Sequence, residues 1–248
     1  MSEYDRIAEK YRDSKLLPFR DYIESYTLFK LAGNLAGKSV LDLACGEGHY
    51  TRRLMQAGAK AVLGVDLSSR MIELAQEAES REPLGCRYQT GDAADLELDR
   101  QFDLITGVYL LNYAASVEQL TRLCRSAFRH LKPGGRFIGF NDNIANDPAN
   151  YPKYEKYGFI KTTSQNRIEG APITYLLINP DGTRFQFDNF YLHNRTYQKA
   201  FEDAGFLAFN WEGPWLSPAG EKAYPPGYWS ELLDDPPLIG FAAQKAIE

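Results

Sequence analysis

Short apolar runs alternate with helix-like stretches from about residue 38 to residue 143, and this alternation most restricts the fold. The runs are continuously apolar, as is typical of parallel strands that are buried on both faces of a sheet. Repeated strand–helix units need right-handed crossovers and favour an open, doubly wound sheet. The expected strands are Ser39–Ala44, Ala61–Asp66, Cys86–Thr90, Phe102–Val108 and Arg136–Asn141, with helices near 49–57, 69–80 and 117–130.

The third of these helices has clear boundary signals. Ser116-Val-Glu-Gln119 matches a capping box, which predicts the beginning of the helix. His130 and Lys132 lie near its negative end, and Pro133-Gly-Gly135 predicts its stop.

Three segments flank or interrupt this core. Residues 1–37 precede it as an N-terminal extension, with a helix expected at Asp21–Ala36. Residues 144–192 form an insertion in which Ile173–Leu192 predicts a β-hairpin, because its Asn-Pro-Asp-Gly turn presets φ at Pro and permits positive φ at Gly. Residues 193–248 complete the sheet, so that one domain spans residues 1–248. The segment 193–248 is expected to contain a helix at Arg195–Ala204 and a last strand at Leu238–Gln244.

Composition and charge exclude several classes of protein. The chain has 248 residues, 44% of them hydrophobic, and a net charge of −5, which together exclude global disorder. No segment is strongly basic, so we expect no nucleic-acid partner. No apolar run reaches the length of a membrane span and the N-terminus lacks a signal-peptide pattern, so we expect a cytoplasmic protein. The oligomeric state stays open.

Cysteine and histidine spacing argues against a bound metal. Cys45, Cys86 and Cys124 are far apart and odd in number, which suits a reduced compartment without a disulfide framework. C-x-x-C and H-x-x-x-H pairs are absent from the sequence, so we expect no metal site.

The strongest chemical signal is Val40-Leu-Asp-Leu-Ala-Cys-Gly-Glu-Gly-His-Tyr50, a buried strand followed by a glycine-containing turn. Gly46 and Gly48 permit close approach of a ligand to the backbone. A dinucleotide fingerprint would need a third glycine at position 51, which is Thr, and a P-loop sequence is absent. Asp42 lies within the strand, where a buried carboxylate costs several kcal/mol unless it is paired. A cationic group of a ligand would serve as its partner.

Acidic residues also end the second and third expected strands. Asp66 follows the second strand, where a carboxylate can accept both hydroxyls of a ribose. Thr90-Gly-Asp-Ala-Ala-Asp95 follows the third strand, and a carboxylate beside a small residue suits an adenine amino group.

These three motifs, in this order, resemble the class I S-adenosylmethionine-dependent methyltransferases over residues 38–143. The resemblance implies an α/β, Rossmann-like, mostly parallel seven-stranded sheet with an N-terminal helical lid and an inserted substrate-binding β-hairpin. It implies S-adenosylmethionine as cofactor and S-adenosylhomocysteine as product, with His49 in place of the usual third glycine. The residues that it assigns to the cofactor are Tyr11, Asp42, Ala44, Gly46, Gly48, Asp66, Leu67, Met71, Asp92, Ala93 and Tyr109.

A closer resemblance, to toxoflavin-synthase-like N-methyltransferases, rests on the lid and on prolines near the C-terminus. The segments that carry it are Tyr4–Lys15, Lys15-Leu-Leu-Pro-Phe-Arg20, Lys132-Pro-Gly-Gly135 and Pro236-Pro237. It implies methylation of a nitrogen atom on a flat heterocyclic metabolite in secondary metabolism. O- or C-methylation of another small molecule and a non-catalytic cofactor-binding module stay open. A nicotinamide enzyme is opposed by the missing third glycine.

The acceptor pocket is expected over the carboxyl ends of the fourth and fifth strands, lined in part by aromatic residues of the inserted hairpin. In its second strand, Phe185, Phe187, Asn189 and Tyr191 share one face. A plainer interpretation is that these aromatics only form a core. The residues expected to bind the acceptor are Arg20, Asn112, Asn141, Asn143, Tyr175, Phe187, Asn189 and Tyr191. His193 and Tyr113 are the candidate bases, although each is also an ordinary polar residue.

Overall fold

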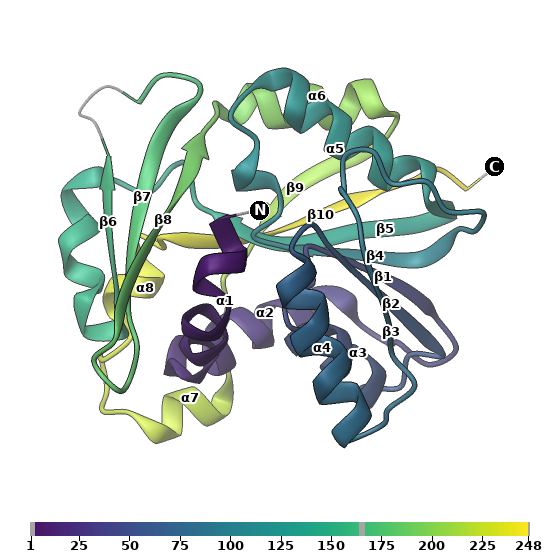
Figure 1. Ribbon diagram of the computed structural model, residues 1–248. Coiled ribbons are helices and arrows are strands. Elements are labelled where there is room, and N and C mark those ends of the chain that lie inside the picture. Colours follow the sequence, from purple (N-terminus) through teal and green to yellow (C-terminus); the bar gives the residue numbers. More distant parts are fainter. Residues whose placement is uncertain (1–2, 164–166, 248) are drawn as a thin grey trace.

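A seven-stranded sheet forms the centre of the computed structural model, which describes residues 3–163 and 167–247. Its strands are β1 (Ser39–Leu43), β2 (Ala61–Asp66), β3 (Arg87–Thr90), β4 (Phe102–Val108), β5 (Leu131–Asp142), β9 (Ala208–Glu212) and β10 (Leu238–Gln244). The spatial order is β3-β2-β1-β4-β5-β10-β9, and β10 runs antiparallel to both of its neighbours (Figure 1). The other pairings are parallel, which confirms the expected Rossmann-like class.

Helices cover both faces of this sheet (Figure 1). One face carries α2 (Tyr26–Ala32), α3 (His49–Gln56) and α4 (Ser69–Arg81), and the other carries α5 (Val117–Arg129) and α6 (Asn194–Ala204). The central strands are therefore buried on both sides, which explains their continuously apolar sequences. The carboxyl ends of β1 to β4 meet at one edge, and this edge positions the site.

The beginning of α5 confirms the capping box. The Ser116 hydroxyl accepts a hydrogen bond from the Gln119 amide at 3.3 Å, and the Gln119 side chain accepts one from the Ala115 amide at 2.8 Å. The expected stop at Pro133-Gly-Gly135 differs from the structure, because β5 already begins at Leu131. These residues instead form an irregularity in the pairing of β5 with β4, after which the regular register resumes at Arg136.

A second sheet of three antiparallel strands lies beside the first (Figure 1). It contains β6 (Phe159–Thr163), β7 (Ala171–Ile178) and β8 (Arg184–Tyr191), and the helical segment η4 (Pro148–Tyr157) precedes it. The expected hairpin is confirmed in β7 and β8, where Phe185, Phe187 and Asn189 are buried on one face. The sequence did not indicate β6, whose polar residues Lys161 and Thr162 interrupt an apolar pattern.

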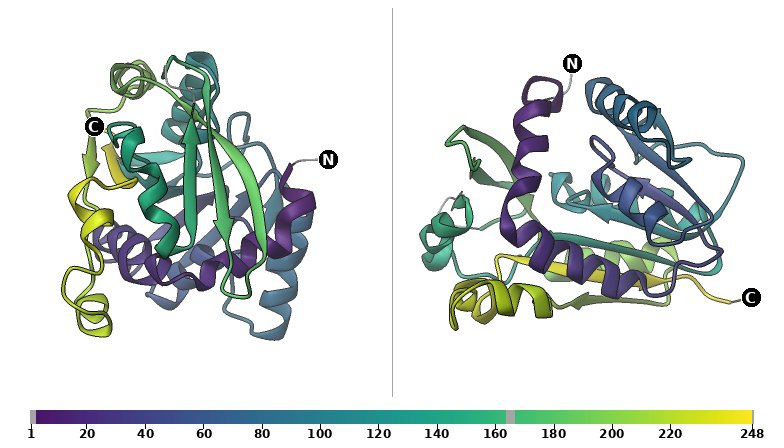
Figure 2. Two further views of the ribbon diagram at one scale, coloured as in Figure 1. Left: turned by 90° about the vertical axis from the view of Figure 1, so that its left-hand side faces the viewer. Right: turned by 90° about the horizontal axis from the view of Figure 1, so that it is seen from below.

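The N-terminal segment crosses the space between the two sheets (Figure 2). It consists of α1 (Glu3–Asp13), η1 (Ser14–Leu16) and the π-helical η2 (Arg20–Ser25), which continues into α2. Helical backbone therefore begins at Pro18, three residues before the expected Asp21, and ends at Ala32, after which Gly33 takes a φ of 65°. The segment α1 contacts α4 on one side and β8 on the other, which is the placement of a lid.

Two short helices, α7 (Pro218–Ala223) and α8 (Ser230–Asp234), lead into the last strand. Among the described residues, no helix is long and apolar enough to cross a membrane.

Candidate active site

A cavity of about 360 Å³ opens at the carboxyl ends of β1 to β4. This is where an open α/β sheet binds its ligands, because the loops that leave neighbouring strands diverge there. We call it the cofactor cavity. Of the residues predicted for the cofactor, it brings together Tyr11, Ala44, Gly46, Asp66, Leu67, Met71, Asp92, Ala93 and Tyr109.

The loop after β1 has the backbone that its glycines predict. Gly46 and Gly48 take φ values of 55° and 85°, and Ala44 also lies at a positive φ of 55°. The Asp66 carboxylate, at the end of β2, accepts hydrogen bonds from the amides of Gly46 at 2.8 Å and Ser68 at 2.9 Å. Asp66 thus joins the loops after two neighbouring strands and faces the cavity with a negative charge.

Asp42 is buried, but its hydrogen-bond donors belong to the chain itself. The hydroxyls of Thr51 and Thr106 donate to its two oxygens at 2.6 and 2.7 Å. Burial raises the pKa of Asp42 to about 6, because the hydroxyls offset the loss of hydration only in part. The sequence favoured a cationic ligand as the partner of this carboxylate, whereas the structure supplies two threonines.

A small void of about 20 Å³ continues the cofactor cavity past Asp42. Lys15 of the lid, His49 and Tyr50 line it together with Gly46. Burial and the charges of Lys15 and Arg53 lower the pKa of His49 to about 3, so its ring is neutral at physiological pH. This end of the cavity therefore presents the ammonium group of Lys15 beside the carboxyl groups of Asp42 and Glu47.

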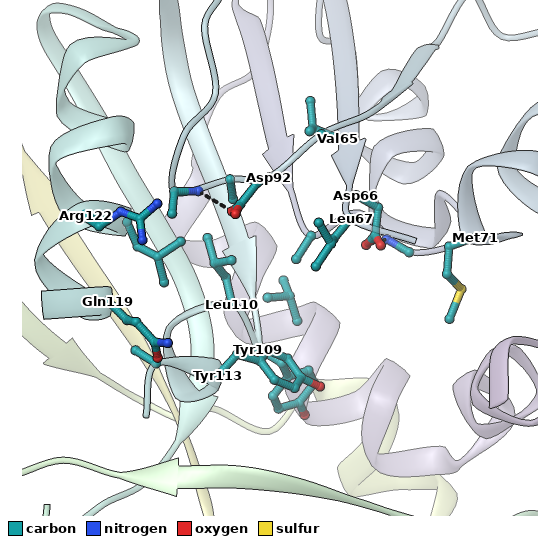
Figure 3. Close-up of a pocket in the computed structure, with 18 of the residues that line it drawn as sticks. Val65, Asp66, Leu67, Met71, Asp92, Tyr109, Leu110, Tyr113, Gln119 and Arg122 are labelled. Atoms are coloured by element: carbon teal, nitrogen blue, oxygen red, sulfur yellow. Dashed lines mark hydrogen bonds between the residues drawn. The ribbon is translucent and has the colours of Figure 1, made fainter. Parts of the chain in front are cut away.

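The opposite end of the cofactor cavity is mostly apolar. Leu67 lines this end and is 62% exposed, so its side chain is free to cover a ligand. The Asp92 carboxylate accepts a hydrogen bond from the Ala94 amide at 2.8 Å and faces the cavity beside Arg122 (Figure 3). Further lining residues that were not predicted for the cofactor include Leu110, Ala114, Gln119, Arg122 and Leu123.

Tyr109, directly after β4, connects the cavity to a buried charge cluster. It takes a φ of 61°, which is uncommon for an aromatic residue, and its hydroxyl donates to Glu24. Glu24 also accepts from Tyr50 at 2.5 Å and from Arg20 at 2.7 Å, and Lys15 lies 3.8 Å away. Burial raises the pKa of Glu24, but Arg20 and Lys15 outweigh it and hold the pKa below its ordinary value. The sequence did not single out Glu24, because a helical glutamate carries no motif.

A second, closed void of about 10 Å³ adjoins Tyr11 and Tyr109, and we call it the acceptor cavity. Tyr11 and Tyr109 line both cavities, so the two spaces share a wall. Four residues predicted for the acceptor lie here: Arg20, Tyr175, Phe187 and Asn189. The rings of Tyr175 and Phe187 stack with centroids 5.7 Å apart and planes 5° from parallel.

The structure places Asn141, Asn143 and Tyr191 in its own hydrogen-bond network, whereas the side chain of Asn112 is buried without a hydrogen-bond partner among the described residues. The Asn141 side chain accepts from the Asn112 amide at 3.1 Å, and Asn143 donates to the Pro236 carbonyl at 2.7 Å. Tyr191 and His193 lie 3.2 Å apart at the beginning of α6. In the described structure, neither cavity is lined by Asn112, Asn141, Asn143, Tyr191 or His193. Gly48, which was predicted for the cofactor, also lines neither cavity, because its backbone packs under Tyr88. Of the candidate bases, Tyr113 lines the cofactor cavity.

Among the described residues, no group of three His, Cys, Asp or Glu side chains is arranged to hold a metal ion. The three cysteines are free and buried.

The fold and the strand-end cavity define a class, the S-adenosylmethionine-dependent methyltransferase fold. The chain aligns over 99% of its length with a methyltransferase of this kind from Clostridium acetobutylicum ATCC 824, at a TM-score of 0.63 and 20% identity, and covers 100% of that structure. It aligns over 86% of its length with one from Mesorhizobium loti, at a TM-score of 0.59 and 23% identity, and covers 93% of that structure.

Sequence similarity points to the same class of protein. Residues 40–135 match the family model of a methyltransferase domain. The ubiquinone biosynthesis O-methyltransferase of Pseudomonas fluorescens (strain SBW25) is 35% identical over 120 residues, which are 48% of this chain and 49% of that protein. The demethylmenaquinone methyltransferase of Tropheryma whipplei (strain Twist) is 35% identical over 138 residues, 54% and 55% of the two chains.

A third relative covers more of the chain. The dTDP-4-amino-2,3,4,6-tetradeoxy-D-glucose N,N-dimethyltransferase of Saccharopolyspora spinosa is 29% identical over 188 residues, 69% of this chain and 72% of that protein. The chain thus spans about half the length of the first two relatives. The resemblance to toxoflavin-synthase-like enzymes is not supported by these similarities and stays a prediction.

Proposed function

We propose that this protein is an S-adenosylmethionine-dependent methyltransferase that acts on a small, flat acceptor. The observation that carries the proposal is the pair of adjoining cavities, one at the strand ends with Asp66 and Asp92, the other closed and aromatic. Tyr11 and Tyr109 lie between them and line both. A volume of about 360 Å³ is in the range that small-molecule ligands occupy.

The donor set of the cofactor cavity suits S-adenosylmethionine. Asp66 would accept the ribose hydroxyls, and Leu67 and Ala93 would cover the adenine beside Asp92. The loop at Gly46 and the void at Lys15 would hold the methionine part. When bound, this cofactor supplies an electrophilic methyl group on a sulfonium ion.

The chain's own residues have three tasks in this proposal: they orient the acceptor, exclude water and complement the positive sulfonium. Orientation alone supplies several kcal/mol when two reactants are held in line. The faces of Tyr11 and Tyr109 would stabilise a neighbouring cation by about 0.5–2 kcal/mol. Tyr113 is the base candidate that the geometry supports best, because it lines the cofactor cavity and His193 lines neither.

For the acceptor we favour a nitrogen heterocycle methylated on nitrogen, as in toxoflavin-like secondary metabolism, in the cytoplasm. The stacked aromatic walls support a flat ring, and the free cysteines support a reduced compartment. O- or C-methylation of another small molecule is the alternative within the same proposal, and a non-catalytic cofactor-binding module is the alternative outside it.

Calorimetry of the purified protein with S-adenosylmethionine, S-adenosylhomocysteine and NAD tests this function. We expect micromolar binding of both sulfur ligands and none of NAD. Asp66→Ala should weaken both sulfur ligands by at least about tenfold, since a charge-assisted hydrogen bond contributes roughly 1.5–3 kcal/mol.

The matched control is Asp188→Ala, which removes an exposed carboxylate on β8 that accepts from Thr174 outside both cavities. This variant should bind like the unmodified protein. Absence of binding by either sulfur ligand, with a folded protein by circular dichroism, would overturn the proposal.

A further inference from the structure

Two buried polar groups line the acceptor cavity without a hydrogen-bond partner in the described part of the chain. They are the Nε–H of Arg20 and the side-chain oxygen of Asn189. The two residues are 3% and 1% exposed, so bulk water does not reach them in this closed state. An unsatisfied buried polar group costs about 1–3 kcal/mol, and a site that keeps two of them is complementary to a ligand that pairs with both.

Most of the charges around this cavity are paired, but Arg20 keeps one N–H that is not. Glu24 is the carboxylate nearest to Arg20, and it is shared with Lys15, so two cations surround one anion. On the other wall, Asp142 is matched by Lys161 at 2.7 Å. Lys15 also faces Asp42 in the adjoining void, whereas Arg20, which lines the acceptor cavity, keeps a buried N–H without a partner in the described part of the chain.

The phenols that line this cavity do not supply a negative charge for the free N–H of Arg20. Burial, together with a neighbouring carboxylate, raises the pKa of Tyr109 and of Tyr175, so both phenols are neutral at physiological pH. Tyr11 lines the cavity as a further phenol. Glu24 holds the pKa of Arg20 above its ordinary value despite burial, so the guanidinium remains charged.

The shape of the cavity selects a flat ligand. Phe19 and Arg20 come from the lid side, and Phe159, Tyr175 and Phe187 come from the inserted sheet. A void of about 10 Å³ holds at most one water, so a ring enters only when the lid side and the sheet side separate. The ring would then lie against the stacked Tyr175 and Phe187.

We propose that the acceptor binds as the anion of a flat ring, a deprotonated ring N–H or an enolic or phenolic oxygen, that also carries one further N–H or O–H. Arg20 donates its free Nε–H to the anion, and Asn189 accepts from the remaining N–H or O–H. This inference rests on the proposed function and names the chemical class of its acceptor.

The step is balanced without a base in the closed site. The acceptor loses its proton to water before the lid closes. A lone pair of the ring nitrogen or oxygen then forms the new bond to the methyl carbon, and the electrons of the carbon–sulfur bond leave with the neutral thioether. The methylated ring is uncharged, so its attraction to Arg20 ends and release is favoured.

The test uses coloured probes whose anions absorb at longer wavelength than their neutral forms. 4-Nitrocatechol is the oxygen probe and 5-nitrouracil the nitrogen probe, and both keep one further donor after ionisation. Each is titrated against the protein loaded with S-adenosylhomocysteine. We expect at least one of them to bind as its anion, with the pKa of the bound probe lowered by about one unit or more, a tenfold preference for the anion.

Variants assign the effect to the two residues. Arg20→Met should abolish the pKa shift of the probe and weaken binding at least about tenfold, whereas Arg20→Lys should keep the shift because it keeps the charge. Asn189→Leu should weaken 4-nitrocatechol and leave 4-nitrophenol, which lacks the second hydroxyl, unchanged. Arg184→Met is the control, since Arg184 is an exposed arginine at the beginning of β8 that lines neither cavity.

Three outcomes would overturn the inference: neither probe binds as its anion, Arg20→Met keeps the shift, or Asn189→Leu weakens both phenols equally. If Arg20→Met fails to fold, Arg20→Lys and Asn189→Leu decide alone. Calorimetry with S-adenosylhomocysteine on the same samples separates the two proposals. Failure of that ligand to bind rejects the proposed function, and normal binding without an ionised probe rejects only the acceptor class.

Discussion

Two buried carboxylates lie beside the cofactor cavity, and their surroundings push their pKa values in opposite directions. The hydroxyls of Thr51 and Thr106, with the charge of Lys15, offset the loss of hydration at Asp42 only in part, so its pKa rises to about 6. Glu24 faces Arg20 and Lys15, so attraction by cations dominates and its pKa falls. Partner charge, more than depth of burial, therefore decides the ionisation of each acid.

At this scale we predict that Asp42→Asn changes how stability depends on pH. The folded pKa of Asp42 is raised above its unfolded value of 3.8, so the native state loses stability as pH rises through the window from about 4 to about 6. The asparagine variant lacks this loss. Relative to the unmodified protein, the free energy of unfolding of this variant should therefore rise by about 3 kcal/mol between about pH 4 and pH 7.

Chemical denaturation at several pH values measures this difference. Asp99→Asn, an exposed carboxylate in a loop, is the control and should follow the unmodified protein. If the free energy of unfolding depended on pH in the same way in Asp42→Asn and in the unmodified protein, the pKa of Asp42 would not be raised by folding.

At the scale of elements, the unit from β1 through the glycine loop into α3 builds one wall of the cofactor cavity. The loop turns sharply enough to need left-handed φ values, and Gly48 additionally lies under the ring of Tyr88 from β3. A Cβ at Gly48 would approach the Tyr88 hydroxyl to 2.6 Å. The third glycine of the usual pattern is absent because position 49 already begins α3, where His49 takes ordinary helical backbone.

We predict that Gly48→Ala is more destabilising than Gly58→Ala. Both glycines have positive φ, 85° and 98°, so both variants carry the same kind of backbone strain, about 1 kcal/mol or more. Only Gly48 has a close neighbour, whereas a Cβ at Gly58 meets nothing within 4 Å. The difference in the free energy of unfolding should be about 1–3 kcal/mol, the range for overpacking.

Thermal melts compare the stabilities of the two variants directly. Calorimetry with S-adenosylhomocysteine measures how each substitution affects ligand binding at the loop. Gly48→Ala should also bind the ligand more weakly, while Gly58→Ala should bind it normally. Equal losses in the two variants would mean that Tyr88 moves aside freely.

At the scale of the whole molecule, a buried ion pair joins the two sheets. Asp142 ends β5 of the main sheet, Lys161 lies on β6 of the inserted sheet, and their charged atoms are 2.7 Å apart with both side chains almost fully buried. Tyr175 of β7 donates to the same carboxylate. The pair fixes how the inserted sheet sits on the main sheet, and with it the wall of the acceptor cavity.

We predict that Lys161→Met destabilises the protein by about 3–5 kcal/mol, because it leaves the Asp142 carboxylate buried without its counter-charge. The double variant Asp142→Asn/Lys161→Met should recover most of this loss, since no unpaired charge remains. A double-mutant cycle by chemical denaturation measures the coupling. Additive losses would show that the two charges act independently.

The order of strands and helices was predictable from local patterns in residues 38–143, because apolar periodicity and capping residues act over a few residues. The same holds for the acids at the strand ends, since parallel topology brings the carboxyl ends of neighbouring strands to one edge whatever the loops do. Elements at the periphery escaped prediction: β6 and the edge strand β9 have half-exposed or mixed sequences that carry no clear period.

Partners far apart in the chain were decided only by the tertiary structure. The sequence indicated Asp42 as a buried acid, but only packing shows that Thr106, 64 residues away, supplies a donor. Asn141 and Asn143 looked like acceptor ligands, yet their amides satisfy the chain's own backbone. The sequence by itself determined which strand ends carry charge, because that is local. Which buried groups find partners and which remain free for a ligand depends on elements brought together by folding.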